Sequence, residues 1–142
     1  MDLIEKDSKA FDVVMDAMRS PAETATEKKK KEASIEKATI EAAKVPLTTM
    51  QHSYSAMTHA LVAAEKGNIN SITDAGVAIH ALMAAIEGAA LNVRVNLGSI
   101  KDRAFAEKTS KEVEKLLTDA TKLKAEILEI VDARMKQLSG TT

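Results

Sequence analysis

Residues 72–97 read ITDAGVAIHALMAAIEGAALNVRVNL, the most apolar stretch of the chain. Apolar residues fall on most sides of the helix that this stretch predicts, and such a helix is usually central in its assembly. Steps of three and four residues from Asp74 trace one stripe, small in the middle and polar at both ends: Ala78, Ala81, Ala85, Gly88, Asn92 and Asn96. Small side chains let another helix or a flat ligand approach the backbone closely. We therefore expect a central helix with a polar group at each end of one face.

Hydrophobic periodicity predicts three more long helices, over about residues 2–18, 26–66 and 103–138. Pro46 lies inside the second of them and lacks a backbone N–H, so we expect a kink or break at that point. Gly67 suits the end of the same helix, because glycine adopts a left-handed cap conformation without cost. The predicted fold is an all-α bundle of four long helices, with the second kinked at Pro46 and the third central, in a single domain over residues 1–142.

The composition excludes several classes of protein. The chain has 142 residues, no cysteine and a formal net charge of −1. It therefore has no disulfide, thiol nucleophile or cysteine metal site, and its charge draws it to neither nucleic acid nor anionic membrane. The N-terminal MDLIEK carries acids without an apolar signal core. His80 and Glu87 interrupt the best apolar run, so we expect no membrane span, no nucleic-acid partner and a cytoplasmic location.

The polar residues around the start of the third helix have two interpretations each. Asp74 follows Ser71 at the spacing of a capping box, and an acid in the first turn also complements the helix dipole. Its carboxylate could equally act on a ligand held at the helix N-terminus. Asn68 and Asn70 are ordinary turn formers at least as often as ligand contacts. Sequence physics alone favours capping for Asp74 and leaves both readings of the asparagines open.

Asp7, Asn92 and Asn96 also stand out. Asp7 lies on the apolar stripe of the first helix between Ile4 and Phe11. It is either an acid that frays into solvent or a partly buried carboxyl able to exchange a proton near neutral pH. If Asn92 and Asn96 are buried, each unsatisfied amide costs about 1–3 kcal/mol, so we expect hydrogen-bond partners for both.

We expect no metal centre. His52 and His59 are two helical turns apart, too far to share a metal without other ligands, and no acidic cage or His-Glu-x-x-His motif occurs. The run Lys28–Lys31 is flanked by acids and lacks interleaved aromatics. It is best interpreted as the solvated face of a helix, with attraction of a polyanionic ligand tail as the minority alternative.

Several motifs in order resemble one folate enzyme family. GNINSITDAGVA at 67–78 and EGAALNVRVNL at 87–97 closely resemble the cyclodeaminase/cyclohydrolase family. Its members include the C-terminal domain of formiminotransferase-cyclodeaminase and stand-alone methenyltetrahydrofolate cyclohydrolases. DSKAFDVV at 7–14 looks like the family's aspartate-then-Ala-Phe helix, and KVPL at 44–47 looks like its kinked Val-Pro-Leu. The resemblance extends across nearly the whole chain.

The resemblance implies an all-helical fold that dimerises or forms a higher homo-oligomer, with a folate site in a cleft near the subunit interface. It implies hydrolysis of methenyltetrahydrofolate, or cyclisation of formiminotetrahydrofolate with release of ammonia. The substrate is then a tetrahydrofolate derivative and no metal takes part, because the substrate supplies the electrophile. The implied acid–base carboxylate is Asp74, with Asp7 as second candidate. The implied substrate-binding residues are Asn68, Asn70, Ser71, Asn92 and Asn96.

Members of that family carry a glycine-rich segment and a helix before the Asp-Ala-Phe motif, whereas this sequence starts at Met1, just ahead of it. The resemblance therefore implies a chain without that segment. An alternative of a different class is a helical assembly protein that keeps the family's core without its catalysis. The small-residue stripe would then serve packing between subunits.

Overall fold

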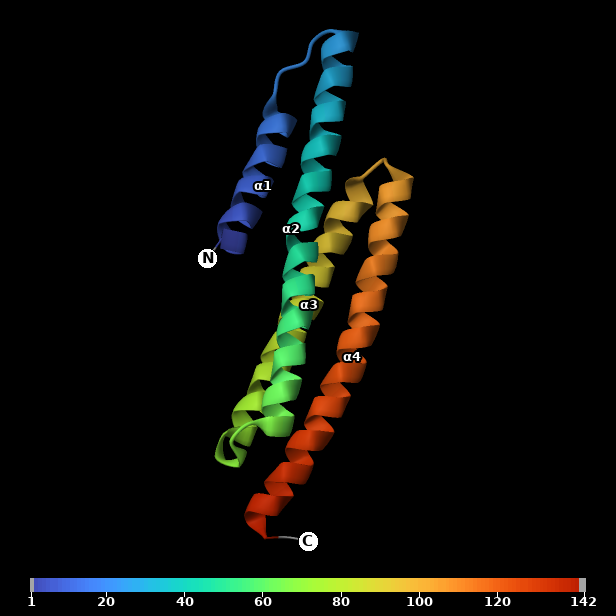
Figure 1. Ribbon diagram of the computed structural model, residues 1–142. Helices are drawn as coiled ribbons and strands as arrows, with labels where there is room; N and C mark the ends of the chain where they lie inside the picture. The colour runs from blue at the N-terminus through green and yellow to red at the C-terminus, as the bar shows by residue number, and fades with distance from the viewer. Residues whose placement is uncertain (1, 141–142) are drawn as a thin grey trace. The chain divides into compact units, whose positions relative to one another are not determined.

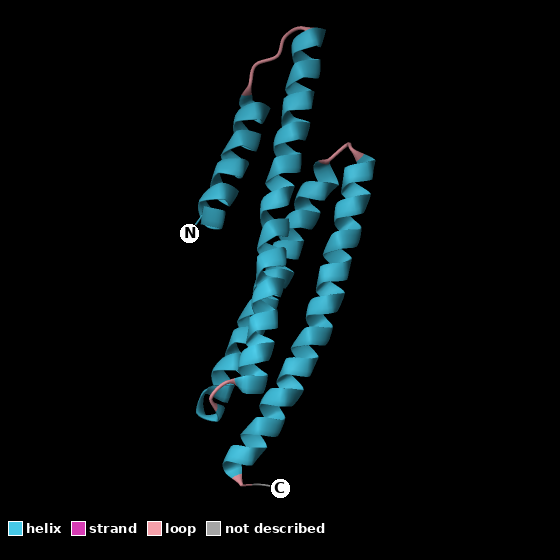
Figure 2. Ribbon diagram, in the orientation of Figure 1, coloured by secondary structure: helices cyan, strands magenta, loops and turns pink. Residues whose placement is uncertain are grey.

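The computed structural model describes residues 2–140, and helices make up nearly all of them (Figure 1). The described residues contain no strand (Figure 2). The helices are α1 (Asp2–Arg19), α2 (Ala25–Lys66), the short 3₁₀ turn η1 (Ile69–Ser71), α3 (Ile72–Ser99) and α4 (Arg103–Ser139). The all-α class, the four long helices and their approximate bounds are confirmed.

Helix α2 continues through Pro46 without a break. Proline leaves the carbonyl four residues earlier without its usual donor. Just beyond it, the Thr48 hydroxyl donates to Lys44 O at 2.9 Å and the Thr49 hydroxyl donates to Val45 O at 3.3 Å. Such back-bonding adds partners for carbonyls around the proline and is compatible with bending. The break at Pro46 is wrong, and the kink stays a prediction.

The chain divides into two compact units. Unit 1 comprises residues 1–49 and 89–113, and unit 2 comprises residues 50–88 and 114–142. Unit 1 thus takes α1, the first part of α2, the last part of α3 and the start of α4, and unit 2 takes the remainder of the three long helices. The single domain over residues 1–142 stays a prediction.

Large aliphatic side chains build the core of unit 2. Met50 and Met57 of α2, Ile79 and Ile86 of α3, and Ile127 of α4 are fully buried. Each removes most of its apolar surface from water, which stabilises a fold by about 1.5–3 kcal/mol per side chain. Ala120 and Val131 of α4 are buried as well, so one face of this helix is directed into the core.

Unit 1 has a core of smaller side chains, and α1 contributes little to it. The buried residues include Ala38, Ala43, Ala90, Val93 and Val113, whereas Ala17 is the one buried hydrophobic residue of α1 among those described. The sequence pattern places a set of apolar residues on one stripe of α1, yet Ile4, Phe11 and Met18 are exposed by 74%, 63% and 48%. These side chains lie along the surface of unit 1 instead of inside it.

Helix α3 buries one face and exposes the other. It supplies many core residues, but its apolar residues Val77, Leu91 and Val95 are 69%, 61% and 74% exposed. A helix that is apolar on most sides needs cover on most sides. In the single chain, other helices cover only one side of α3. The helix is therefore central on that side and exposed to water on the other.

The apolar length of α3 exceeds the sequence expectation. Helix α3 and the turn before it form a helical segment of 31 residues, Ile69–Ser99. Its most apolar window of 18 residues has a mean hydropathy of 1.5, and 33% of that window is buried. By length and composition this is the one helix among the described residues that is apolar enough to cross a membrane. The expectation that no apolar run approaches that length is wrong, because isolated polar residues lower the mean too little. Core helices of soluble proteins meet the same criterion, so this finding assigns no membrane to the chain.

A capping box starts α2. The Thr24 hydroxyl accepts from Glu27 N at 3.2 Å, and the Glu27 carboxylate accepts from Thr24 N at 2.9 Å and from Glu23 N at 3.0 Å. These backbone N–H groups would otherwise lack a partner at the helix start. The backbone bonds from Thr24 and Glu23, with the Thr24 hydroxyl, lower the pKa of Glu27 below its ordinary value of 4.5.

Replacing Glu27 by alanine tests this cap through its pH dependence. Because the folded state lowers the pKa of Glu27, its stabilisation is complete above about pH 4.5 and is lost as pH falls through the lowered value. Urea unfolding at a series of pH values should give Glu27→Ala a lower free energy of unfolding than wild type at pH 7. The difference between the two free energies should become smaller as the pH falls. Glu129→Ala, an exposed acid of α4, is the control. A difference in free energy of unfolding that becomes larger as the pH falls would contradict the hydrogen bonds given to the Glu27 carboxylate.

Candidate functional sites

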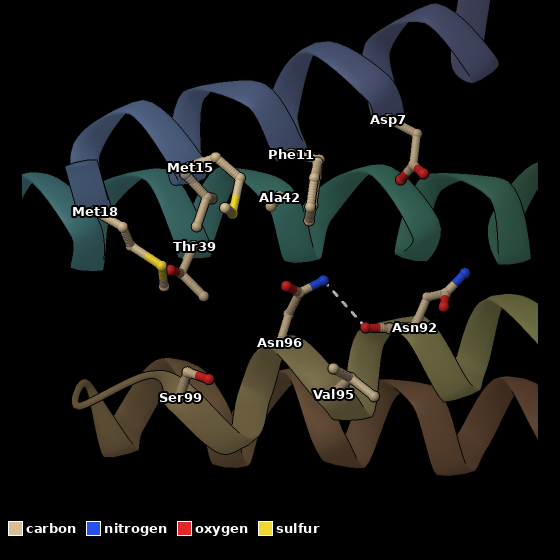
Figure 3. A pocket seen from close by; sticks show the side chains of 11 residues that line it. Asp7, Phe11, Met15, Met18, Thr39, Ala42, Asn92, Val95, Asn96 and Ser99 are labelled. Atoms are coloured by element: carbon tan, nitrogen blue, oxygen red, sulfur yellow. Dashed lines mark hydrogen bonds between the residues drawn. The ribbon is translucent and has the colours of Figure 1, made fainter.

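A hollow on unit 1 gathers three of the predicted site residues. It has a volume of about 320 Å³ and is lined by residues of α1, α2 and α3: Asp7, Phe11, Val14, Met15, Met18, Thr39, Ala42, Asn92, Val95, Asn96 and Ser99. Figure 3 shows Asp7 and Phe11 directed from α1 toward the side of the hollow where α3 presents Asn92 and Asn96. Residues of three separate segments thus line one concavity that mixes carboxylate, amides and apolar surface.

The two side-chain amides of α3 in this hollow differ in exposure and in hydrogen bonding. Asn92 is exposed and Asn96 is half-buried. The Asn96 side chain donates from Nδ2 to Asn92 O at 3.1 Å, which fixes its orientation on the helix (Figure 3). Among the described residues, the Asn92 side chain makes no hydrogen bond within the chain. The expected hydrogen-bond partner is therefore present for Asn96, whereas the exposed amide of Asn92 is available to water or to a ligand.

Asp7, Thr39 and Ser99 add a carboxylate and two hydroxyls to the wall of this hollow. Asp7 is exposed, which excludes the partly buried carboxyl among its two interpretations. Its carboxylate nevertheless points toward the hollow that it lines (Figure 3). Thr39 is buried and its hydroxyl donates to Ile35 O at 2.9 Å, so the hydroxyl oxygen can still accept a bond.

A second hollow, on unit 2, gathers three other predicted residues. It has a volume of about 300 Å³, and its wall is mostly alanine and glycine: Ala60, Ala63, Gly67, Asn68, Ser71, Asp74, Ala75 and Ala78. The polar members are Asn68, Ser71 and Asp74, which come from the turn before α3 and from its first turn. Asn70 lines neither hollow.

The turn that carries these residues is built by its own backbone and by Asn68. Asn68 caps η1, since its Oδ1 accepts from Asn70 N at 3.0 Å and its carbonyl accepts from Ser71 N at 3.0 Å. This is the turn-forming role, one of the two that the sequence leaves open for Asn68. Its side-chain N–H₂ group stays available for a second role.

Asp74 does not form the predicted capping box. It lies exposed in the first turn of α3, and among the described residues its carboxylate accepts no hydrogen bond from the chain. The role in capping that sequence physics favours for Asp74 is therefore wrong. Its negative charge still suits the positive end of the helix dipole. Both oxygens of this carboxylate remain available to a ligand at the rim of the hollow.

Gly67 ends α2 as predicted, but for a different reason. Among the described residues the only positive φ belongs to Gly140, so Gly67 is not a left-handed cap. A Cβ on Gly67 would lie 2.3 Å from Ala63 O, an impossible contact with backbone. The glycine is needed because the chain passes close to the last turn of α2, where Gly67 N donates to Ala63 O at 2.9 Å.

Two residues that the sequence did not single out hold the connections between helices. In unit 1, one oxygen of Glu36 accepts from Lys101 N at 2.8 Å and from Asp102 N at 2.9 Å, and so ties the α3–α4 connection to α2. In unit 2, Arg134 of α4 donates to Ala64 O and to Gly67 O. No local pattern marks either residue, because their partners lie more than 60 positions away in the sequence.

The described residues contain no group of three or more His, Cys, Asp or Glu side chains arranged to hold a metal ion. The polar groups of both hollows are carboxylates, amides and hydroxyls, with apolar or small residues between them. Such walls fit an organic ligand that has flat apolar faces and hydrogen-bonding edges. The two hollows are candidate binding sites of that kind.

Comparison with known proteins defines the class. The model of the Formiminotransferase-cyclodeaminase family matches residues 1–115. The chain is 42% identical over 133 residues to a methenyltetrahydrofolate cyclohydrolase of Methylorubrum extorquens, covering 94% of this chain and 64% of the relative. It is 30% identical to the formimidoyltransferase-cyclodeaminase of Gallus gallus, covering 93% of this chain and 24% of that protein.

A solved structure agrees with these sequence relatives. The crystal structure of formiminotetrahydrofolate cyclodeaminase from Thermotoga maritima matches with a TM-score of 0.83 and 26% identity, covering 93% of this chain and 62% of that one. The chain belongs to the formiminotransferase-cyclodeaminase family. It spans a little under two thirds of the length of the bacterial relatives that it matches.

The close contact at Gly67 predicts a clear difference between two glycine substitutions. Gly67→Ala should lower the free energy of unfolding by about 1–3 kcal/mol, because its Cβ collides with Ala63 O. Gly98→Ala is the matched control, since Gly98 lies in α3 and its Cβ would meet nothing within 4 Å. The control should gain about 0.4–1 kcal/mol. Equal effects of the two substitutions in urea unfolding would show that the turn does not need glycine.

Proposed function

We propose that this chain binds a tetrahydrofolate derivative and hydrolyses 5,10-methenyltetrahydrofolate to the formyl form. The observation that carries the proposal is the 42% identity to a methenyltetrahydrofolate cyclohydrolase over 94% of this chain. Family members named cyclodeaminases are less similar, at 26% to 34% identity. Cyclisation of formiminotetrahydrofolate with release of ammonia is therefore the second reaction to test.

The walls of the hollow on unit 1 support folate binding. Phe11, Met15 and Val95 offer apolar surface to the faces of a pterin ring, and the Asn92 and Asn96 amides can bond its polar edge. The volume of about 320 Å³ falls at the lower end of the range typical of ligand pockets, roughly 300–1,000 Å³. Part of a folate would occupy such a hollow and the rest would extend beyond it.

The reaction needs one group that moves protons. A water molecule adds to the bridge carbon of the substrate and gives up a proton to a carboxylate, so that the carbon becomes tetrahedral between two nitrogens. One carbon–nitrogen bond then breaks as the carboxyl group returns the proton to the leaving nitrogen. The carbonyl forms as the hydroxyl of the intermediate loses its own proton to solvent, so the net reaction releases one proton. The cationic methenyl bridge is its own electrophile. A positioned carboxylate therefore suffices for the protein's part.

Asp74 is the first candidate for this carboxylate and Asp7 the second. Both are exposed, both line a hollow, and neither is bonded within the described chain. Asp74 has polar neighbours in Asn68 and Ser71, whereas Asp7 has the amides of Asn92 and Asn96. Each set can orient a water molecule or the edge of the substrate.

We propose further that the active protein is a homodimer or higher homo-oligomer in the cytoplasm. The exposed apolar residues Val77, Leu91 and Val95 on one face of α3 support association, because water contacts them in the single chain. The same exposed face favours the alternative function, a helical assembly protein without catalysis. The two proposals differ in whether the chain binds and turns over folate.

Turnover of methenyltetrahydrofolate tests the proposal. Purified protein should speed the loss of the methenyl absorbance above the spontaneous rate. Asp74→Asn should reduce the enzymatic rate by about 10²–10⁴-fold, because an amide cannot accept the proton. Asp7→Asn, measured beside it, tests the second candidate. Asp132→Asn, an exposed acid of α4, is the matched control and should retain full activity.

The outcomes separate the candidates. A normal rate in Asp74→Asn with a collapsed rate in Asp7→Asn would move the acid–base role to unit 1. Normal rates in both variants would remove both carboxylates from the mechanism. If the wild-type protein neither accelerates the reaction nor binds 5-formyltetrahydrofolate by calorimetry, the folate proposal fails and the assembly function gains support.

A further inference from the structure

Arg134 of α4 bonds to the end of α2, directly before the turn that leads into α3. Its guanidinium donates from Nη1 to Ala64 O and from Nη2 to Gly67 O, the latter at 2.8 Å. Both acceptors belong to the end of α2, where the last carbonyls of a helix have no partner within the helix. A cation at that end also suits the negative pole of the helix dipole. The planar fork of arginine matches two neighbouring carbonyls in a way that a single ammonium cannot.

The two carbonyls sit at the base of the turn that forms the hollow on unit 2. Gly67 itself lines the hollow, and Asn68, the next residue, caps η1. From there only η1 separates the clamped Gly67 carbonyl from the first turn of α3, which holds Asp74. Movement of Gly67 would therefore move the polar wall of the hollow as one piece.

We propose that Arg134 is a positioning residue for Asp74 and for the turn 67–71, acting through the carbonyls of Ala64 and Gly67. The proposal rests on the proposed function, with Asp74 as the acid–base carboxylate. Arg134 lies outside residues 1–115, the part that the family model matches, so the family assignment does not include it. Its half-buried side chain touches backbone and does not line the hollow. Its effect on the reaction is indirect.

The experiment compares three variants of the full chain. Arg134→Met keeps much of the stem and removes both hydrogen bonds, whereas Arg134→Lys keeps the charge and can hold one carbonyl. Ile127→Val removes one buried methyl group from the core of unit 2 and supplies the control for lost stability. Kinetics with methenyltetrahydrofolate are measured well below the unfolding temperature of every variant. Amide hydrogen exchange is followed over residues 67–78.

We expect Arg134→Met to lose at least tenfold in kcat with a smaller change in KM, because misplacing a reacting group impairs chemistry more than binding. Arg134→Lys should recover part of that loss. Exchange should rise over residues 67–74 in Arg134→Met and stay unchanged over residues 103–113. Ile127→Val should lower the unfolding temperature and leave kcat at the wild-type value.

Three results would overturn the role of Arg134. One is an active wild-type protein with unchanged kcat in Arg134→Met. Another is an equal fall in kcat in Ile127→Val, which would trace the effect to stability alone. The third is unchanged exchange over residues 67–74. Failure of the proposed function looks different, since the wild-type protein itself would then show no acceleration.

Discussion

Burial of one face of α3 is the constraint on which the rest of the structure depends. Ile72, Ile79, Ile86, Val93 and Ile100 recur every seven residues and are all at most 2% exposed. The first four lie in α3, where this spacing keeps one seam of the helix directed inward, and Ile100 directly follows the helix. Both units use part of that seam as their core. The side of α3 away from the seam is left at the surface, and it includes Asp74, Asn92 and the exposed apolar residues Val77, Leu91 and Val95.

Much of the fold is predictable because hydrophobic periodicity reports which face of each helix is buried. The predicted bounds of the four helices lie within about two residues of those observed, and the inward residues of α4 are buried or half-buried. Periodicity does not report which partner covers a face. For that reason the apolar stripe of α1 predicts the helix but does not reveal that Phe11 lies on the surface of unit 1. The hydrogen bonds of Arg134 and Glu36 cannot be predicted from a local sequence pattern, because they join segments that lie far apart in the chain.

The sequence predicts which polar residues belong to the candidate sites. It does not predict how these residues are arranged in space. The predicted polar residues separate into two hollows, with Asp7, Asn92 and Asn96 in one and Asn68, Ser71 and Asp74 in the other. Asp74 was expected to cap its own helix, yet its carboxylate has no partner among the described residues. A carboxylate that is not engaged in holding its helix is free for chemistry. Membership of the formiminotransferase-cyclodeaminase family supports the proposal that this chemistry acts on a folate.

Binding of folate by these hollows can be measured by amide NMR titration of the full chain with 5-formyltetrahydrofolate, a stable relative of the proposed substrate. We expect saturable shifts confined to the residues around one or both hollows, over residues 7–18 and 92–99 or over residues 67–78. The helix surfaces that line neither hollow, such as α4 over residues 121–130, should stay unchanged. An absence of shifts, or shifts spread evenly over the four helices, would contradict the central claim that these hollows bind folate.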